Sequence, residues 1–150
     1  MKLSRASTYA FYGLSYIANQ PKGRYVPLSE IHEHYGVPEK HLAKIFQAFV
    51  KAGILASARG VHGGFCLLKP AADVSALDVI EIVEGPVQSP GCLLLQQACE
   101  VQQACQINTV WKDAQGAMLN VLRGAKLTDM LQNPRPRAHG LLQVTSRRSV

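Results

Sequence analysis

The stretch from residue 27 to residue 68 constrains the fold most, because its hydrophobic pattern changes from a helical period to short strands. A short helix is predicted after Pro27, and Gly36 can end it because glycine accepts the left-handed conformation of a helix C-cap. Pro38 then opens a second helix, since proline is tolerated at a first helical turn. The apolar face of this second helix is formed by Leu42, Ile45, Phe46, Phe49 and Val50. Two helices joined at a glycine are typical of a helix-turn-helix.

Two short strands are predicted directly after these helices. Residues 54–59 and 65–68 have strand character, and the glycines between them suit a hairpin tip. Such a wing would carry Arg59 at its tip, where an arginine can enter the focused negative potential of a DNA minor groove. The sequence therefore predicts a mainly α protein with a small β-wing, in which a winged helix-turn-helix DNA-binding domain spans residues 1–70.

The distribution of charge favours a polyanionic partner at the front of the chain. Residues 1–70 contain nine Lys or Arg and three acids, a net +6, whereas residues 71–132 contain three bases and seven acids, a net −4. Residues 133–150 contain four arginines and no acid, and we expect them to form a disordered basic tail that adds non-specific DNA affinity. An ordinary distribution of surface charge is the alternative explanation.

Two further helices are predicted by their caps. Ser4 can cap a helix over residues 4–18, and Ser75 can cap a linking helix that ends near Gly85. In our division of the chain, the linking helix and the loop after it make up residues 71–106.

A long helix is predicted over residues 107–123, within a dimerisation segment that we place at 107–132. Its apolar stripe consists of Val110, Trp111, Ala114, Ala117, Met118, Val121 and Leu122. A domain this small cannot bury so long a stripe, so we expect it to pack on the same helix of a second copy, with packing inside one subunit as the alternative. Such a homodimer would suit a palindromic DNA operator. Thr128 is expected to cap a last short helix over 128–131.

Several classes of protein are excluded by what the sequence lacks. It has no nucleophile–base motif, phosphate-binding loop or carboxylate pair typical of an enzyme, so we expect no catalysis and no small-molecule substrate. It also has no apolar run long enough to cross a membrane and no signal-peptide pattern. We therefore expect a cytoplasmic protein without a membrane partner.

Three of the four cysteines, Cys92, Cys99 and Cys105, lie within 14 residues. Thiols this close in a cytosolic chain indicate metal ligands or redox groups more often than structural disulfides. Soft thiolates favour an iron–sulfur cluster, whereas a closed zinc site would need a fourth Cys or His, and a thiol or disulfide switch is a further alternative. Cys66 lies in a predicted wing strand and is expected to act as a small apolar residue.

Three segments resemble the Rrf2 family of winged-helix transcription regulators, which includes IscR-like and NsrR-like members. They are MKLS at 1–4, VPLSEI at 26–31 and RGVHGGF at 59–65, and the resemblance extends over roughly residues 1–132. It implies a homodimer whose second motif helix lies in the major groove, whose wing arginine enters the minor groove, and whose cysteine loop can hold an iron–sulfur cluster. Carried over position by position, the DNA-binding residues are Leu28, Ser29, Pro38, Glu39, Lys40, His41, Ala43, Lys44, Arg59, Gly60, His62 and Gly63.

The chain departs from the family's pattern at several positions. IscR-like members place a glutamate where this chain has Ala43, which leaves the operator sequence open. They also place a histidine, the fourth cluster ligand, where this chain has Asn108. Some NsrR-like members use a carboxylate where this chain has Ser7 and Thr8. Both familiar fourth ligands are therefore absent.

A small molecule, a hydroxide or a residue of the partner subunit could supply the fourth ligand. His32 and His34 are candidates, although both are also expected as ordinary surface histidines. The wide gap between Cys92 and Cys99 resembles iron-responsive members with a 4Fe-4S cluster, which we favour slightly over 2Fe-2S. We expect a DNA-binding repressor whose operator affinity is controlled by a cluster that senses iron, redox state or nitric oxide. A cluster-free repressor of the same family, using thiol or zinc chemistry, is the alternative.

Overall fold

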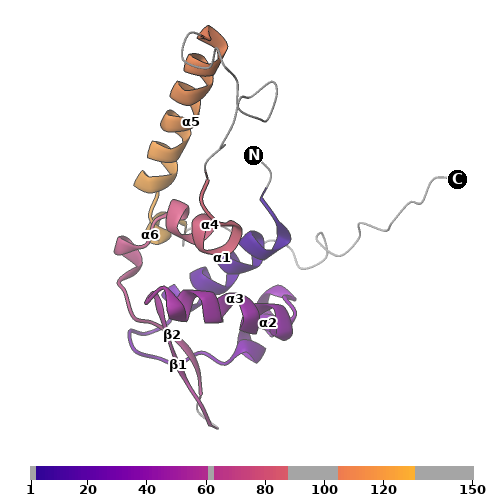
Figure 1. Ribbon diagram of the computed structural model, residues 1–150. Coiled ribbons are helices and arrows are strands. Elements are labelled where there is room, and N and C mark those ends of the chain that lie inside the picture. The colour runs from indigo at the N-terminus through magenta and orange to yellow at the C-terminus, as the bar shows by residue number, and fades with distance from the viewer. Residues whose placement is uncertain (1–2, 61–62, 88–104, 131–150) are drawn as a thin grey trace, which may run out of the picture.

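The computed structural model describes residues 3–60, 63–87 and 105–130. It consists of a helical body, a two-stranded wing at one end, and a long helix that extends from the other end (Figure 1). Outside the described residues lie the predicted basic tail over 133–150, His62, Cys92 and Cys99.

Three helices at the start of the chain form the predicted helix-turn-helix and the helix that supports it. α1 covers Arg5–Ala18 and begins at Ser4, whose side-chain oxygen accepts a hydrogen bond from an amide of the first turn. α2 covers Leu28–Tyr35 and ends at Gly36, which adopts a φ of 69°. α3 covers Glu39–Lys51. These bounds confirm the sequence-based prediction, because the caps and apolar spacing that decide them are local.

The apolar face of α3 lies at the centre of the core. Leu42, Phe46 and Phe49 are fully buried, and Ile45 and Val50 are half-buried beside them. Since this face packs against the body, the opposite face of α3 exposes Glu39, Lys40, Lys44 and Gln47 to solvent.

α1 approaches α3 closely at Gly13. A Cβ atom at this position would lie 2.4 Å from Cζ of Phe46 and 3.2 Å from Cδ2 of Leu42. Only a residue without a side chain fits here while the Phe46 ring stays in place. This close approach sets the spacing between α1 and α3, and nothing in the sequence pattern indicates it.

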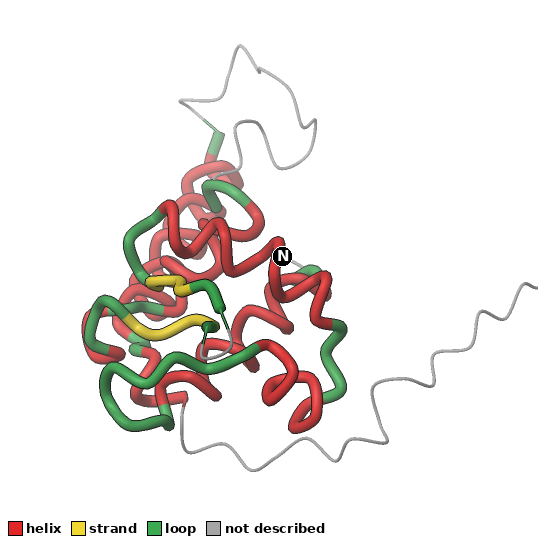
Figure 2. The backbone as a smooth tube through the Cα atoms, turned by 90° about the horizontal axis from the view of Figure 1, so that it is seen from below, coloured by secondary structure: helices red, strands yellow, loops and turns green. Residues whose placement is uncertain are grey.

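The wing is an antiparallel pair of β1, Leu55–Ala58, and β2, Gly64–Leu67. Ala58 lies opposite Gly64 at the outer end of the pair. β1 is shorter than the predicted 54–59, because Arg59 already belongs to the tip. Figure 2 shows the two strands side by side in front of the helical body.

β2 is joined to the body by a second backbone pairing, one residue from the outer end of the strand pair. The amide of Val26 donates to the carbonyl of Phe65 at 2.8 Å, and the amide of Phe65 donates to the carbonyl of Val26 at 2.9 Å. The wing is therefore held on the segment that leads directly into α2.

After the wing, a short 3-10 helix, η1, covers Ala71–Asp73 and is followed by α4, Ala76–Glu84. Ser75 caps α4 as predicted, and its side chain accepts a hydrogen bond from the amide of Asp78 at 3.1 Å. The Asp78 carboxylate accepts from the Ser75 amide in return, at 2.8 Å. This reciprocal capping box fixes where α4 begins, and α4 packs against α1.

α5 covers Gln106–Gly124 and extends away from the body (Figure 1). Its predicted apolar stripe is only partly covered within this chain: Trp111, Met118 and Leu122 are half-buried, whereas Val110 is 61% exposed and Val121 70% exposed. Asn108 is the one α5 residue that is fully buried. Across the described ranges, no helix combines the length and apolar character needed to span a bilayer.

α6 covers Leu127–Met130, so the last helix begins one residue before the predicted Thr128. Thr128 lies inside this helix and does not cap it, because the Asp129 carboxylate accepts a hydrogen bond from the Lys126 amide at 2.8 Å. Leu127 is fully buried, and α6 packs against α1 and η1. The segment 107–132 thus contains two helices with different neighbours.

Candidate nucleic-acid interface

The solvent face of α3 presents the residues that the sequence predicted for the major groove. Pro38, Glu39, Lys40, His41 and Lys44 are exposed, and Ala43 is half-buried. Within the described residues, neither Lys40 nor Lys44 forms an ion pair. Two free ammonium groups on one exposed helix face can reach phosphates or base edges.

The start of α2 contributes less than predicted. Ser29 is exposed, whereas Leu28 is half-buried and packs against the core. The connection from α2 to α3 is fixed by Val37, which is buried and whose carbonyl lies 3.0 Å from Nδ1 of His32. The turn therefore holds α2 and α3 in one fixed relation.

The tip of the wing presents Arg59 and Gly60 to solvent, as predicted. The amide of Gly63 donates to the carbonyl of Gly60 at 2.9 Å and closes the turn. A Cβ at Gly63 would lie 2.5 Å from the carbonyl oxygen of Ala58, so this position needs glycine. Arg59 has no ion-pair partner among the described residues and is free to meet a phosphate or a groove.

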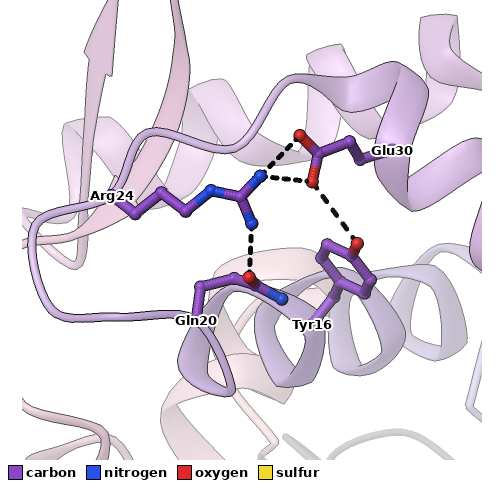
Figure 3. Close-up of polar contacts among 4 residues, drawn as sticks. All are labelled: Tyr16, Gln20, Arg24 and Glu30. Carbon is purple, nitrogen blue, oxygen red and sulfur yellow. Dashed lines mark hydrogen bonds and ion pairs between the residues drawn. The ribbon is translucent and has the colours of Figure 1, made fainter.

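A polar network that sequence reasoning missed orders the connection between α1 and α2 (Figure 3). Arg24 forms a bidentate pair with the Glu30 carboxylate, at 2.8 and 3.0 Å, and also donates to Gln20. The Tyr16 hydroxyl donates to the same carboxylate at 3.4 Å. Partial burial is the larger cause that raises the pKa of Tyr16, and the negative charge of Glu30 raises it further. The network fixes α2 on α1, although no sequence motif marks it.

A second missed contact joins the end of α4 to the start of α1. The Glu84 carboxylate accepts a hydrogen bond from the amide of Ser4 at 2.9 Å and from the hydroxyl of Ser7 at 2.5 Å. These hydrogen bonds lower the pKa of Glu84. α1 has no acid in its own first turn, so Glu84 supplies the negative charge that favours a helix N-terminus.

The cysteine motif is represented in the described residues by Cys105 alone. It occupies the N-cap position of α5, where its carbonyl accepts from the amides of Asn108, at 3.1 Å, and Thr109, at 3.2 Å. Its thiol is free, half-buried and not used for capping. Cys66 is free and buried in β2, as expected for a small apolar residue.

The histidines considered as cluster ligands have other neighbours. His32 faces a backbone carbonyl, and the ring of His34 lies against Tyr35 and Tyr16 at centroid distances of 4.5 and 5.1 Å. Within the part of the chain that the structure describes, no three His, Cys, Asp or Glu side chains gather as metal ligands would.

Together, the fold and this surface define a winged-helix, DNA-binding transcription regulator. The family model named Rrf2, described as an iron-dependent transcriptional regulator, matches residues 3–133. The chain belongs to the Rrf2 family, whose members are DNA-binding regulators and not enzymes. The predicted fold class and family are both confirmed.

Solved structures agree on the fold. The global cysteine regulator CymR (YrzC) of B. subtilis is 24% identical over 87% of this chain and 96% of its own, with a TM-score of 0.73. The oxidized form of CymR from Staphylococcus aureus is 22% identical over 91% of this chain and 100% of its own, with a TM-score of 0.68. IscR of T. potens is 25% identical over 87% of this chain and 86% of its own, with a TM-score of 0.67.

Proposed function

We propose that this protein is a homodimeric repressor that binds a palindromic operator with α3 in the major groove and Arg59 in the minor groove. The observation that carries the proposal is that α3 and the wing tip both expose cations without an ion pair among the described residues. Lys40 and Lys44 are exposed on α3 and Arg59 is exposed at the wing tip, with no ion pair to any of them among the described residues. Cations of this kind provide phosphate contacts and minor-groove insertion.

The proposed dimer rests on the exposed stripe of α5. Val110 and Val121 are more than half exposed in the single chain, and the exposed Ala114 and Ala117 lie between them on the same helix face. A contiguous exposed apolar patch of this kind favours a protein–protein contact. A second copy of α5 would cover them and would place two α3 helices at a fixed separation. Half-sites one helical turn apart require such a fixed separation.

We further propose that Cys92, Cys99 and Cys105 hold an iron–sulfur cluster, with 4Fe-4S favoured over 2Fe-2S. Cys105 fits this role because its free thiol lies at the first turn of α5, where unpaired amides favour negative charge. A bound cluster would supply a redox-active centre that responds to iron supply, oxidants or nitric oxide. Cys105 would then link the state of the cysteine loop to α5, and α5 to the separation of the α3 helices.

A cluster-free repressor remains the second candidate, because Cys105 forms no disulfide within the described residues and is partly accessible. Oxidation of such thiols, or zinc binding by them, could constrain the same loop. An oxidized form has been solved for the CymR relative from Staphylococcus aureus.

The test is an absorption spectrum with iron and sulfide assays on protein purified without oxygen. We expect absorbance at about 400 nm, typical of iron–sulfur charge transfer, with iron and sulfide in equal amounts. Cys105→Ala should lose this absorbance, whereas Cys66→Ala, a buried cysteine outside the motif, should keep it. A colourless protein that takes up no iron and sulfide on reconstitution would leave the cluster-free repressor.

Control of DNA binding is tested separately on a duplex selected from a random pool. We expect wild-type protein to bind this duplex with different affinity before and after removal of iron. Suppose that Cys92→Ala, Cys99→Ala and Cys105→Ala each bound the duplex with wild-type affinity, both before and after removal of iron. Control of DNA binding by the cysteines would then be wrong, and the proposed DNA-binding function would be unaffected.

A further inference from the structure

A groove of about 610 Å³ lies between the start of α1, the solvent edge of α3 and the end of α4. Figure 1 shows these three helices packed together in the body. Pockets that bind small molecules usually have volumes of roughly 300–1,000 Å³. The groove is therefore large enough for a small organic molecule, and none of the residues that line it belongs to the cysteine motif.

The walls of the groove are mostly apolar. They are formed by the side chains of Ala6, Tyr9, Ile45, Ala48, Ile82 and Val83. The ring of Tyr9, from α1, stacks on the ring of His41, from α3, at a centroid distance of 6.2 Å and an angle of 27°. This contact joins the groove wall to α3.

The charged groups at the groove are cationic. Arg5 and Lys44 both line it, His41 adds a ring nitrogen, and no Asp or Glu is among the lining residues. The neighbouring acid, Glu84, is engaged by hydrogen bonds to Ser4 and Ser7. Neither Arg5 nor Lys44 has an ion-pair partner among the described residues. Apolar walls with unpaired cations are complementary to a molecule that joins an apolar body to one negative charge.

We propose that this groove binds a small amphipathic anion, meaning one carboxylate or sulfonate on an apolar body, and that the bound anion weakens DNA binding. The second half of the proposal rests on the proposed function, because it requires α3 to contact DNA. The molecule would be an effector and would not be chemically changed.

The coupling follows from the position of Lys44, which lines the groove and is also on the exposed face of α3. An anion paired with Lys44 removes one cation from the phosphate-binding face. One lost phosphate contact reduces the slope of log affinity against log salt by about 1. Since coupling between two sites is reciprocal, saturating DNA must weaken anion binding by the same factor.

The first experiment titrates the full chain with 8-anilinonaphthalene-1-sulfonate, whose fluorescence rises in apolar surroundings. N-Phenyl-1-naphthylamine, the same molecule without its sulfonate, is the matched neutral probe. Arg5→Gln should weaken the sulfonate about twofold to fivefold, as expected for an exposed ion pair, and leave the neutral probe unchanged. Ala48→Phe should fill the groove and abolish binding of both, and Lys112→Gln on α5 should alter neither.

If wild-type protein, Arg5→Gln and Ala48→Phe bound the sulfonate equally, the dye would be on another surface, such as the α5 stripe, and the groove site would be wrong. Arg5→Gln changes an exposed side chain, so it keeps the test decisive even if Ala48→Phe misfolds, which circular dichroism would show.

The second experiment measures the anisotropy of a duplex of about 20 base pairs, carrying a far-red dye, at low salt. Saturating sulfonate should weaken duplex binding about fivefold in wild-type protein and not in Ala48→Phe. Unchanged DNA affinity with the groove occupied would overturn the coupling. A chain that bound the sulfonate in the groove but no DNA would overturn the proposed function and leave the groove site standing, so the two failures are distinguishable.

Discussion

Gly64 joins the wing to the body, and its substitution by alanine tests how the wing is held. Its φ is 147°, a conformation that residues with a side chain rarely adopt. A Cβ at this position would lie 2.3 Å from the carbonyl oxygen of Val26 and 2.8 Å from the amide nitrogen of Pro27. Both neighbours are backbone atoms, so they cannot rotate away as the end of a side chain could. The two hydrogen bonds between Val26 and Phe65 must therefore open.

The cost of Gly64→Ala can be compared with that of Gly60→Ala in the same wing. Gly60 also has a positive φ, 103°, but its Cβ would meet nothing within 4 Å. Backbone strain costs on the order of 1–3 kcal/mol at each position. Only Gly64→Ala also breaks two hydrogen bonds, at about 1 kcal/mol each. We therefore expect Gly64→Ala to be the more destabilising by about 2 kcal/mol.

Urea unfolding of both variants and the wild-type protein, at one protein concentration, measures this difference in the free energy of unfolding. An equal loss of unfolding free energy in Gly64→Ala and Gly60→Ala would refute the reasoning. Backbone strain alone would then account for both losses, and the close approach of Gly64 to Val26 would contribute nothing. A change in the urea dependence itself would instead indicate an altered unfolded state or loss of two-state behaviour.

Three further predictions address the interface, the dimer and the helix junction. Lys40→Gln should weaken DNA binding for all sequences and reduce the log–log salt slope by about 1, and fluorescence anisotropy should show no such change for Lys112→Gln on α5. Val121→Glu should shift the protein towards monomer in analytical ultracentrifugation, because it places a charge in the exposed stripe, whereas Asn120→Glu should not; equal masses for both would count against the α5 dimer. The stability that Glu84 provides over Glu84→Gln should be complete above its ordinary pKa of 4.5 and be lost as pH falls through its lowered pKa. Urea unfolding between about pH 7 and about pH 3 would show this, and a difference that grew at low pH would contradict it.

The parts of the fold that the sequence predicts are those decided by neighbouring residues. Gly36 ends α2 because the left-handed turn is a property of that residue, and Ser75 caps α4 through a partner three positions away. The exposed face of α3 follows from the spacing of its apolar residues. These signals lie within one or two helical turns and can be read without knowing the tertiary structure.

The parts that the sequence does not predict depend on residues distant along the chain. Glu84 meets Ser4 across a separation of 80 residues, and neither carries a motif that marks the other. Gly13 is an ordinary residue inside an α1 pattern until Phe46 is placed against it. The groove beside α3 likewise exists only after α1, α3 and α4 have packed. Contacts of this kind depend on tertiary packing, so no local sequence pattern predicts them.

Apolar residues near the end of the described chain show why periodicity alone is insufficient. Val121 and Leu127 are six positions apart, yet Val121 is 70% exposed and Leu127 is fully buried. The backbone decides between them, because the amide of Leu127 donates to the carbonyl of Val74 at 2.8 Å and returns the chain to the body. α5 is therefore anchored at its carboxyl end, while Cys105 lies at the other end of a helix of 19 residues, about 28 Å long. Under the proposed function, a constraint at Cys105 acts at the amino end of α5, close to the buried Asn108, and α5 transmits it to the contact between the two subunits.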